Sequence, residues 1–158
     1  INLGTCGGFN GKIQKDTIVL VDKATVYDVY EHMTDNETAI KNYTTEINLS
    51  WLGNNYPMEV QKGPIVSGDR DLIPEELPNL YEKYGAVVGD WESGSISWVC
   101  ARNKVKLLIL RGVSDLVGIK GGEAYEGNKN LWYQAAERIL KRLIVSLPGW
   151  LERLDYDL

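Results

Sequence analysis

Carboxylates stand at two points where an apolar run meets a turn-forming segment. Residues 89–94 read GDWESG after a short apolar run, and residues 110–115 read LRGVSD at the end of a longer one. Ligands of α/β sheets bind beyond the ends of strands, so we expect Glu92 and Asp115 to lie close together at one edge of a sheet. A pair of carboxylates placed there is suited to acid catalysis on a polar ligand.

Other catalytic and cofactor-binding patterns are absent from the sequence. It has neither a Walker loop nor a Gly-x-Gly-x-x-Gly segment, which excludes the common nucleotide-binding signatures. His32 is the only histidine, no Cys/His spacing suits zinc, and no Gly-x-Ser-x-Gly segment offers a serine nucleophile. Carboxylates and hydroxyls remain, and carboxylates are the groups that catalyse glycosidic cleavage. We therefore expect no metal and no cofactor.

Composition limits the class of protein and its partners. The 158 residues fit a single domain over 1–158, and a net charge of −5 without clustered Lys or Arg argues against nucleic acid as a partner. No apolar run is long enough to cross a bilayer and no signal peptide is visible, so we expect no membrane partner. Cys6 and Cys100 are the only cysteines, which favours a reducing, cytoplasmic location. Because the chain starts at Ile1 and enters a strand at once, we expect it to begin inside a domain.

Hydrophobic patterns alternate between strand-like and helix-like segments. Strands are expected at residues 1–3, 17–21 (extended to 27), 64–69, 86–88 and 104–110. Helices are expected from residue 74 with an interruption at Pro78, over 92–103, and from 131 to a point before Pro148. Residues 27–57 read as a long loop with one short helix, 118–127 as a glycine-rich loop, and 152–157 as a solvated acidic tail. This alternation predicts an α/β fold with three α/β/α layers and a mixed central sheet.

Four loops are expected to follow strands directly and to carry the site. They span residues 4–8, 67–72, 90–92 and 111–115. Trp98, Trp132 and Tyr133 stand at helical spacing and are expected in the core or at an interface rather than at a ligand.

Four short segments together resemble a known family. The segments NLGTCGG (2–8), VSGD (66–69), DWESG (90–94) and RGVSD (111–115) occur in the order and approximate spacing of the nucleoside phosphorylase/nucleosidase superfamily. The chain is most similar to the 5′-methylthioadenosine/S-adenosylhomocysteine nucleosidases, from Ile1 to about Leu147. This resemblance implies the C-terminal two thirds of a phosphorylase-like fold that lacks its opening strands. It also implies a small nucleoside as substrate and assembly into homodimers or larger homo-oligomers.

The resemblance also implies roles for residues at the acid end of the site. Asp115 matches the general acid that protonates the imidazole nitrogen of a purine, so that the base leaves neutral. Ser114 matches a residue that orients this carboxylate, and Arg111 matches the arginine beside it. An acid must keep its proton near neutral pH, which the apolar strand before Asp115 favours through burial.

Residues at the sugar side are assigned by the same resemblance. Glu92 matches the glutamate that holds the ribose hydroxyls, and Trp91 stands where the family often has methionine. Thr5, Cys6 and Gly7 match the segment beneath the sugar and the nucleophile.

Two neighbouring residues are assigned to the base. Leu72 matches a position whose backbone meets the adenine edge, and Asp71 stands where nucleosidases usually place an aromatic ring that stacks on adenine.

The nucleophile is expected to be water. Phosphorylases of this superfamily carry an arginine in the strand before the first glycine segment, whereas residues 1–3 here contain no basic side chain that could hold a phosphate dianion. The opening strands of the family, and the glutamate expected to activate water, are not in this sequence. A phosphate-dependent phosphorylase and a non-catalytic, storage-type relative remain alternatives.

Overall fold

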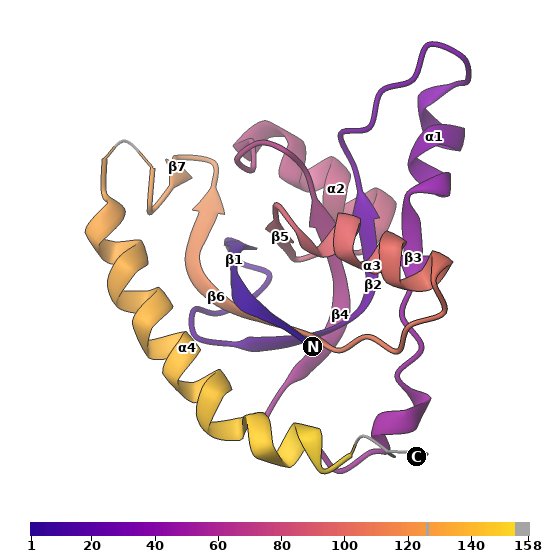
Figure 1. Ribbon diagram of the computed structural model, residues 1–158. Helices are drawn as coiled ribbons and strands as arrows, with labels where there is room; N and C mark the ends of the chain where they lie inside the picture. Colours follow the sequence, from indigo (N-terminus) through magenta and orange to yellow (C-terminus); the bar gives the residue numbers. More distant parts are fainter. Residues whose placement is uncertain (126, 154–158) are drawn as a thin grey trace.

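The computed structural model describes residues 1–125 and 127–153 (Figure 1). The strands in this part of the chain are β1 (Asn2–Phe9), β2 (Ile18–Val26), β3 (Thr44–Glu46), β4 (Gln61–Ser67), β5 (Val88–Asp90), β6 (Ile109–Gly118) and β7 (Gly121–Gly122). They form one mixed sheet in the order β3-β2-β4-β5-β1-β6-β7. Because β2 also pairs antiparallel with β6, the strands β2, β4, β5, β1 and β6 close into a ring.

Helices cover the sheet from two sides. The described residues form α1 (Asn36–Asn42), α2 (Leu77–Tyr84), α3 (Ser93–Arg102), α4 (Lys129–Leu151) and the short 3-10 helices η1 (Ser50–Leu52) and η2 (Pro74–Glu76). Figure 1 shows α4 on one side and α1, α2 and α3 on the other; α4 contacts β6 and β1, and α3 contacts β4, β2 and β3. The predicted α/β fold with a mixed sheet flanked by helices is confirmed. No helix in the described part of the chain combines the length and apolar character needed to cross a membrane.

The segment predicted as a tight glycine loop at residues 4–8 is instead the body of β1. It pairs in parallel with β6 from Asn2 opposite Ile109 to Phe9 opposite Val117. A Cβ atom on Gly8 would lie within 3 Å of three side chains, so this glycine permits close packing in a strand rather than a turn.

The segment predicted as a loop at 111–115 lies inside β6. The strand begins at Ile109, later than the expected residue 104, because Lys104 takes a left-handed conformation (φ 56°) just after α3. Its register against β1 shifts after Val113, which faces Cys6, so that Asp115 faces Gly7 and Ser114 forms a β-bulge. Bulges redirect side chains next to active sites, and this one sets the direction of Asp115.

Both expectations about prolines in helices were wrong. Pro78 lies in the first turn of α2, where its missing N–H group has no helical partner in any case, so it does not interrupt the helix. Pro148 lies inside α4, which continues because Glu152 donates from its backbone to the Pro148 carbonyl oxygen at 3.0 Å.

The expectation for residues 27–57 is partly confirmed, since α1 is the one short helix there, although β3 and η1 also form. The predicted glycine-rich loop contains β7. In the predicted acidic tail, Glu152 is exposed, whereas residues 154–157 lie outside the described residues.

A substitution at Gly112 tests the packing of α4 on β6. A Cβ atom there would lie 2.2 Å from Cγ2 of Ile139, a fully buried residue of α4. Gly112→Ala should therefore lower the free energy of unfolding by about 1–3 kcal/mol, measured by urea denaturation. Gly63→Ala is the control, because its Cβ atom meets nothing within 4 Å, and it should change the value by less than about 0.5 kcal/mol. Equal destabilisation by both variants would contradict the packing described here.

Candidate active site

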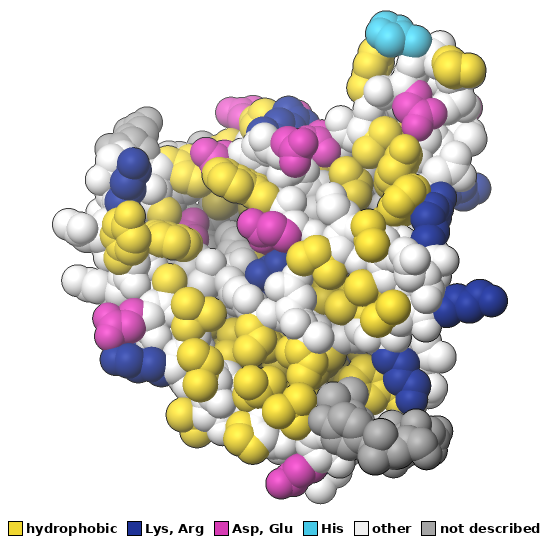
Figure 2. Space-filling model, in the orientation of Figure 1, with side chains coloured by type: hydrophobic (Ala, Val, Ile, Leu, Met, Phe, Trp, Pro, Cys, Tyr) yellow, Lys and Arg dark blue, Asp and Glu magenta, His cyan; other side chains and the backbone are white. Residues whose placement is uncertain are grey.

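One large cavity brings together all ten residues predicted for the site. Its volume is about 1040 Å³, and it lies between β1, the start of α3, the segment after β4, the β6–β7 hairpin and α4. The predicted residues among its lining are Thr5, Cys6, Gly7, Asp71, Leu72, Trp91, Glu92, Arg111, Ser114 and Asp115. Figure 2 shows this face hollowed near its centre, where acidic and basic side chains lie side by side with hydrophobic ones around them.

Asp115 is a buried carboxyl group with a neutral hydrogen-bond partner. It is 6% exposed, and the Ser114 hydroxyl donates to its Oδ1 at 2.6 Å, with the Cys6 carbonyl oxygen at 3.2 Å as a second acceptor. Burial raises the pKa of Asp115; the Ser114 hydrogen bond acts in the opposite direction, and the negative charges of Glu123 and Asp71 add to the increase. The proton is thus held to higher pH than on an ordinary aspartate.

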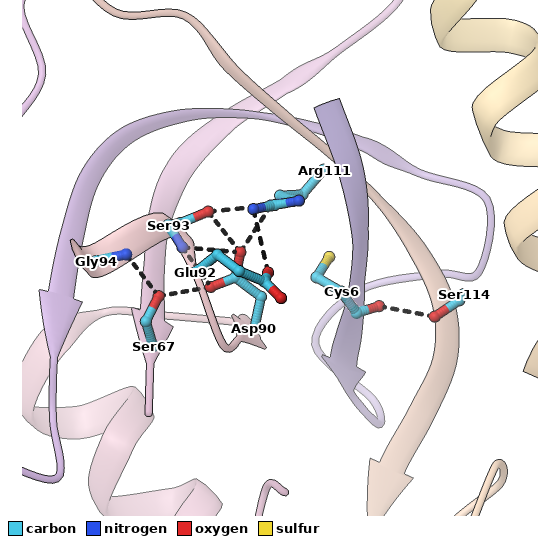
Figure 3. Close-up of polar contacts among 8 residues, drawn as sticks. All are labelled: Cys6, Ser67, Asp90, Glu92, Ser93, Gly94, Arg111 and Ser114. Carbon is cyan, nitrogen blue, oxygen red and sulfur yellow. Dashed lines mark hydrogen bonds and ion pairs between the residues drawn. The ribbon is translucent and has the colours of Figure 1, made fainter. Parts of the chain in front are cut away.

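A second buried carboxylate, Asp90, forms an ion pair with Arg111. The guanidinium Nε lies 2.7 Å from Asp90 Oδ2 and donates to Ser93 Oγ at 3.0 Å (Figure 3). Asp90 also accepts from the Ser67 hydroxyl and from the Ser93 backbone, while Gly94 donates its N–H to Ser67 Oγ at 2.8 Å. Asp90 therefore joins β4, β5, β6 and the first turn of α3.

Glu92 lies beside this ion pair but reaches into solvent. Its side chain is 57% exposed, and its Oε2 accepts from Arg111 Nη2 at 3.3 Å. One guanidinium thus fixes the position of Glu92 and leaves most of the carboxylate free to accept hydrogen bonds from a ligand.

The Arg111 side chain crosses its strand neighbour Gly4. These residues are partners in the β1–β6 ladder, and a Cβ atom on Gly4 would lie 1.8 Å from Arg111 Nη1. Only glycine leaves room for the guanidinium here.

The Cys6 thiol in the same cavity is a poor nucleophile. Burial raises its pKa most, and the negative charge of Asp90 raises it further, so the thiol stays protonated.

A tyrosine lines the cavity near Asp71 and Asp115. Tyr125 donates its hydroxyl to the Leu72 carbonyl oxygen at 2.9 Å, which ties the segment after β4 to the β6–β7 hairpin. Burial, together with the charges of Asp71 and Asp115, raises the pKa of Tyr125 to about 12, so it remains a hydrogen-bond donor at neutral pH.

Several residues that line the cavity were not predicted to do so from the sequence. The role of Asp90 was missed: its carboxylate accepts from the backbone N–H of Ser93, the first residue of α3, and an acidic residue just before a predicted helix is the signal that could have found it. Trp132 and Tyr133, expected in the core or at an interface, are 38% and 59% exposed and line the cavity. Their position follows from α4, whose residues 129, 132, 133, 136 and 140 recur at helical spacing along the cavity wall.

No group of three or more His, Cys, Asp or Glu side chains among the described residues could hold a metal ion. The chemistry available in this cavity is proton transfer by a buried acid, hydrogen bonding by an exposed carboxylate, and donation by a guanidinium.

The sequence matches a known family over most of its length. A family model described as the phosphorylase superfamily matches residues 1–145. The chain belongs to the phosphorylase superfamily.

Similar members of this superfamily are named nucleosidases. A 5′-methylthioadenosine/S-adenosylhomocysteine nucleosidase of Thermotoga maritima is 25% identical over 126 residues, which is 79% of this chain and 57% of that protein. The nucleosidase of the same name from Mycobacterium bovis is 28% identical over 88 residues, covering 55% of this chain and 34% of the relative. The chain therefore spans between about a third and three fifths of the length of these curated relatives.

Solved structures share the fold at lower identity. The apo 5′-methylthioadenosine nucleosidase of Arabidopsis thaliana superposes with a TM-score of 0.67 at 21% identity, covering 90% of this chain and 59% of that one. Futalosine hydrolase of Helicobacter pylori gives a TM-score of 0.73 at 19% identity, covering 96% of this chain and 67% of that one.

The setting of Asp115 predicts a pH-dependent stability difference. The pKa of Asp115 in the folded state is raised above the ordinary value of 3.8, so the folded state binds this proton more tightly than the unfolded chain does. The free energy of unfolding therefore falls as pH rises from the unfolded-state pKa to the folded-state pKa. Asp115→Asn should therefore be more stable than the wild type at pH 7 and should lose this advantage below about pH 4, as measured by urea denaturation at several pH values.

Asp35→Ala provides a control of opposite sign. Hydrogen bonds from Thr38 at the start of α1 lower the pKa of Asp35, so its contribution is present at neutral pH and lost as pH falls. An Asp115→Asn protein that is less stable than the wild type at pH 7 would contradict the assignment of Asp115 as a buried group without a positive partner.

Proposed function

We propose that the protein hydrolyses the N-glycosidic bond of adenine thionucleosides, methylthioadenosine and S-adenosylhomocysteine, giving adenine and the thioribose. The observation that carries this proposal is the unlike environment of two carboxyl groups in one cavity. Asp115 is buried with a raised pKa, whereas Glu92 is largely exposed and lies beside Arg111. Environments that push two carboxyl groups toward opposite protonation states suit the pairing of an acid with a hydrogen-bond acceptor.

Asp115 is the general acid in this proposal. It transfers its proton to the imidazole nitrogen of the purine, while the electron pair of the bond between ribose and base moves onto the base. The base leaves neutral, and the ribose carbon becomes an oxocarbenium-like centre. Water then forms the new C–O bond and releases a proton, which restores the acid through solvent. Ser114 keeps Oδ1 occupied, so Oδ2 of Asp115 is the oxygen available to the base.

The opposite wall of the cavity is assigned to the sugar. Glu92 accepts hydrogen bonds from the ribose hydroxyls, held in place by Arg111 at 3.3 Å. Trp91, 58% exposed at the cavity, supplies an apolar face against the ribose. The backbone of β1 at Thr5, Cys6 and Gly7 forms the floor.

The base is assigned to the part of the cavity lined by Tyr125. There the backbone of Leu72 meets the purine edge, and Asp71 lies in the cavity wall near the general acid.

Hydrolysis is favoured over phosphorolysis by the charge around Arg111. Its guanidinium already has Asp90 at 2.7 Å and Glu92 at 3.3 Å, so two carboxylates offset its positive charge. The net negative charge of this group would repel a phosphate dianion, whereas it would not repel a neutral water molecule. The names of the curated relatives also support hydrolysis. The homo-oligomer and the cytoplasmic location expected from the sequence stay predictions.

Release of adenine from methylthioadenosine without added phosphate, by the intact protein, tests the proposal. Asp115→Asn should lower kcat by about 10²–10⁴-fold with little change in KM, because the proton is needed in the transition state more than in binding. Asp69→Asn, an exposed residue of the same loop as Asp71 outside the cavity lining, is the control and should keep its activity.

The alternatives give different results. Turnover that requires phosphate and yields ribose-1-phosphate products would assign a phosphorylase. A protein whose melting temperature does not shift with adenine or thionucleosides would be a non-catalytic relative.

A second variant tests the sugar-binding role of Glu92. Glu92→Gln should lower kcat/KM for methylthioadenosine by about tenfold to a hundredfold, since hydrogen bonds to a charged acceptor are lost. With a 2′,3′-dideoxy analogue, the wild type and the variant should react at similar rates, because that substrate lacks the hydroxyls. Glu75→Gln, exposed and outside the cavity lining, is the matched control. An equal loss with both substrates would remove Glu92 from the sugar site.

A further inference from the structure

The side chain of Glu123 replaces a backbone acceptor next to Asp115. Glu123 follows β7 and donates its backbone N–H to the Leu116 carbonyl oxygen at 3.0 Å, as the antiparallel partner of that residue. The Leu116 N–H, however, donates at 2.9 Å to Oε2 of the Glu123 side chain. The backbone carbonyl oxygen of Glu123 accepts instead from Asn128 Nδ2 at 2.9 Å. Because the Leu116 N–H belongs to the peptide that follows Asp115, a carboxylate binds the backbone directly beside the acid.

The other carboxylate oxygen of Glu123 is held by a lysine. Oε1 accepts from Lys15 Nζ at 3.0 Å, and Lys15 lies in the loop between β1 and β2. That loop is also bonded to β6, because Asp16 donates its backbone N–H to the Val113 carbonyl oxygen at 2.9 Å. The bulge of β6 is therefore bracketed by hydrogen bonds at Val113 and at Leu116, and the ion pair joins the two brackets.

The Glu123 carboxylate is ionised at neutral pH. Burial acts to raise the pKa of Glu123, but hydrogen bonds from Lys15 and from the Leu116 N–H, together with the charge of Lys15, lower it overall. Burial raises the pKa of Asp115 most; the charge of Glu123 adds to that increase, and the charge of Lys15 opposes it. The two members of the ion pair thus act on Asp115 in opposite directions.

Other titratable groups share the cavity with Asp115. The charge of Asp71, after β4, acts in the same direction as that of Glu123. Among the described residues, the remaining titratable groups of the lining are Cys6, Arg70, Asp90, Glu92, Arg111, Tyr125, Lys129 and Tyr133. Glu123 and Lys15 lie outside this lining. Their effect on a bound substrate therefore passes through Asp115.

We propose that Glu123 is a positioning residue for the acid: its carboxylate, held by Lys15, binds the peptide that follows Asp115 and fixes the direction in which that carboxyl group meets the base. This inference rests on the proposed hydrolysis of a nucleoside. A bulge interrupts the ladder that would otherwise hold the strand, so the residue that follows it needs support from elsewhere. The negative charge of Glu123 also disfavours a second negative charge beside it, which keeps the proton on Asp115.

Two substitutions of Glu123 separate support from charge. Glu123→Gln keeps an oxygen acceptor for the Leu116 N–H and removes the charge, whereas Glu123→Ala removes both. With the intact protein and methylthioadenosine, Glu123→Ala should lower the kcat reached on the acid side of the pH profile by about tenfold, the effect of one lost hydrogen bond. KM should change little, because Glu123 does not line the cavity. Glu123→Gln should restore that kcat.

The pH profile of kcat tests the effect of charge. Activity that needs a protonated Asp115 falls as pH rises through the pKa of that group. Removing the negative charge in Glu123→Gln should move this fall to lower pH, and removing the positive charge in Lys15→Gln should move it to higher pH. Mere loosening of the fold would not move the two variants in opposite directions.

A second ion pair supplies the matched controls. Lys83 Nζ lies 3.0 Å from Glu37 Oε1, and both residues are outside the cavity lining. Glu37→Gln and Lys83→Gln should therefore leave the pH profile and the kcat unchanged.

NMR titration of Asp115 gives a readout that does not require activity. The signal of its carboxyl carbon is assigned by its absence from the spectrum of Asp115→Asn. Its titration midpoint should fall in Glu123→Gln and rise in Lys15→Gln, for the same reason as the pH profile.

The outcomes separate the two proposals. In an active protein, a kcat of Glu123→Ala equal to that of the wild type, or midpoints that move in the same direction in both charge variants, would overturn the role of Glu123. If the wild type releases no adenine while the midpoints move in opposite directions as expected, the proposed hydrolysis fails and the action of Glu123 on Asp115 is upheld.

Discussion

The buried ion pair between Arg111 and Asp90 is the interaction on which the cavity depends. Charges withdrawn from water stabilise a fold only when their partners and hydrogen bonds are complete, and removing one partner leaves the other uncompensated. Here the hydroxyls of Ser67 and Ser93 and the backbone N–H of Ser93 complete the shell around Asp90. Ser67 belongs to β4 and Ser93 to α3, while Asp90 and Arg111 themselves belong to β5 and β6, so the ion pair fixes the relative positions of the elements that surround the cavity. Glu92 is placed by the same guanidinium.

The two buried carboxyl groups of the cavity have opposite electrostatic settings. Asp90 faces a guanidinium at 2.7 Å, whereas Asp115 has the neutral hydroxyl of Ser114 as its hydrogen-bond partner, and the more distant charges of Glu123 and Asp71 raise its pKa more than that of Lys15 lowers it. Of these two buried aspartates, Asp90 thus has a structural role and Asp115 is left able to hold a proton. The difference arises from the ladder register, because Arg111 and Asp115 are four residues apart in β6, on either side of the bulge at Ser114.

The chemistry-bearing residues could be predicted from the sequence more readily than the elements that carry them. Glu92 and Asp115 were expected to lie near each other, and both line the cavity, although Asp115 is inside a strand rather than in a loop. Glycine is common in turns, so residues 4–8 read as a loop, and without β1 as a recognised strand its partner segment at 111–115 reads as a loop as well. Whether a glycine serves a turn or close packing depends on what lies against it, such as the Arg111 side chain over Gly4. Strand pairing between distant segments is not visible in local sequence patterns. The bulge at Ser114 and the cavity wall formed by α4 were missed for the same reason, since both depend on tertiary contacts.

Closure of the ring by β2 and β6 has a consequence for how the protein folds. Ile18 pairs with Gly112 and Leu20 with Leu110, which joins segments about ninety residues apart in the sequence. Contacts of such long sequence separation require costly loop closure and slow the folding of a chain. On the ribosome, β1 and β2 leave the exit tunnel well before β6, so they wait without this neighbour in the sheet while the intervening segment is still being synthesised. During that interval their edges are open to pairing with other chains, which makes this early, half-built sheet the stage at which aggregation competes with folding.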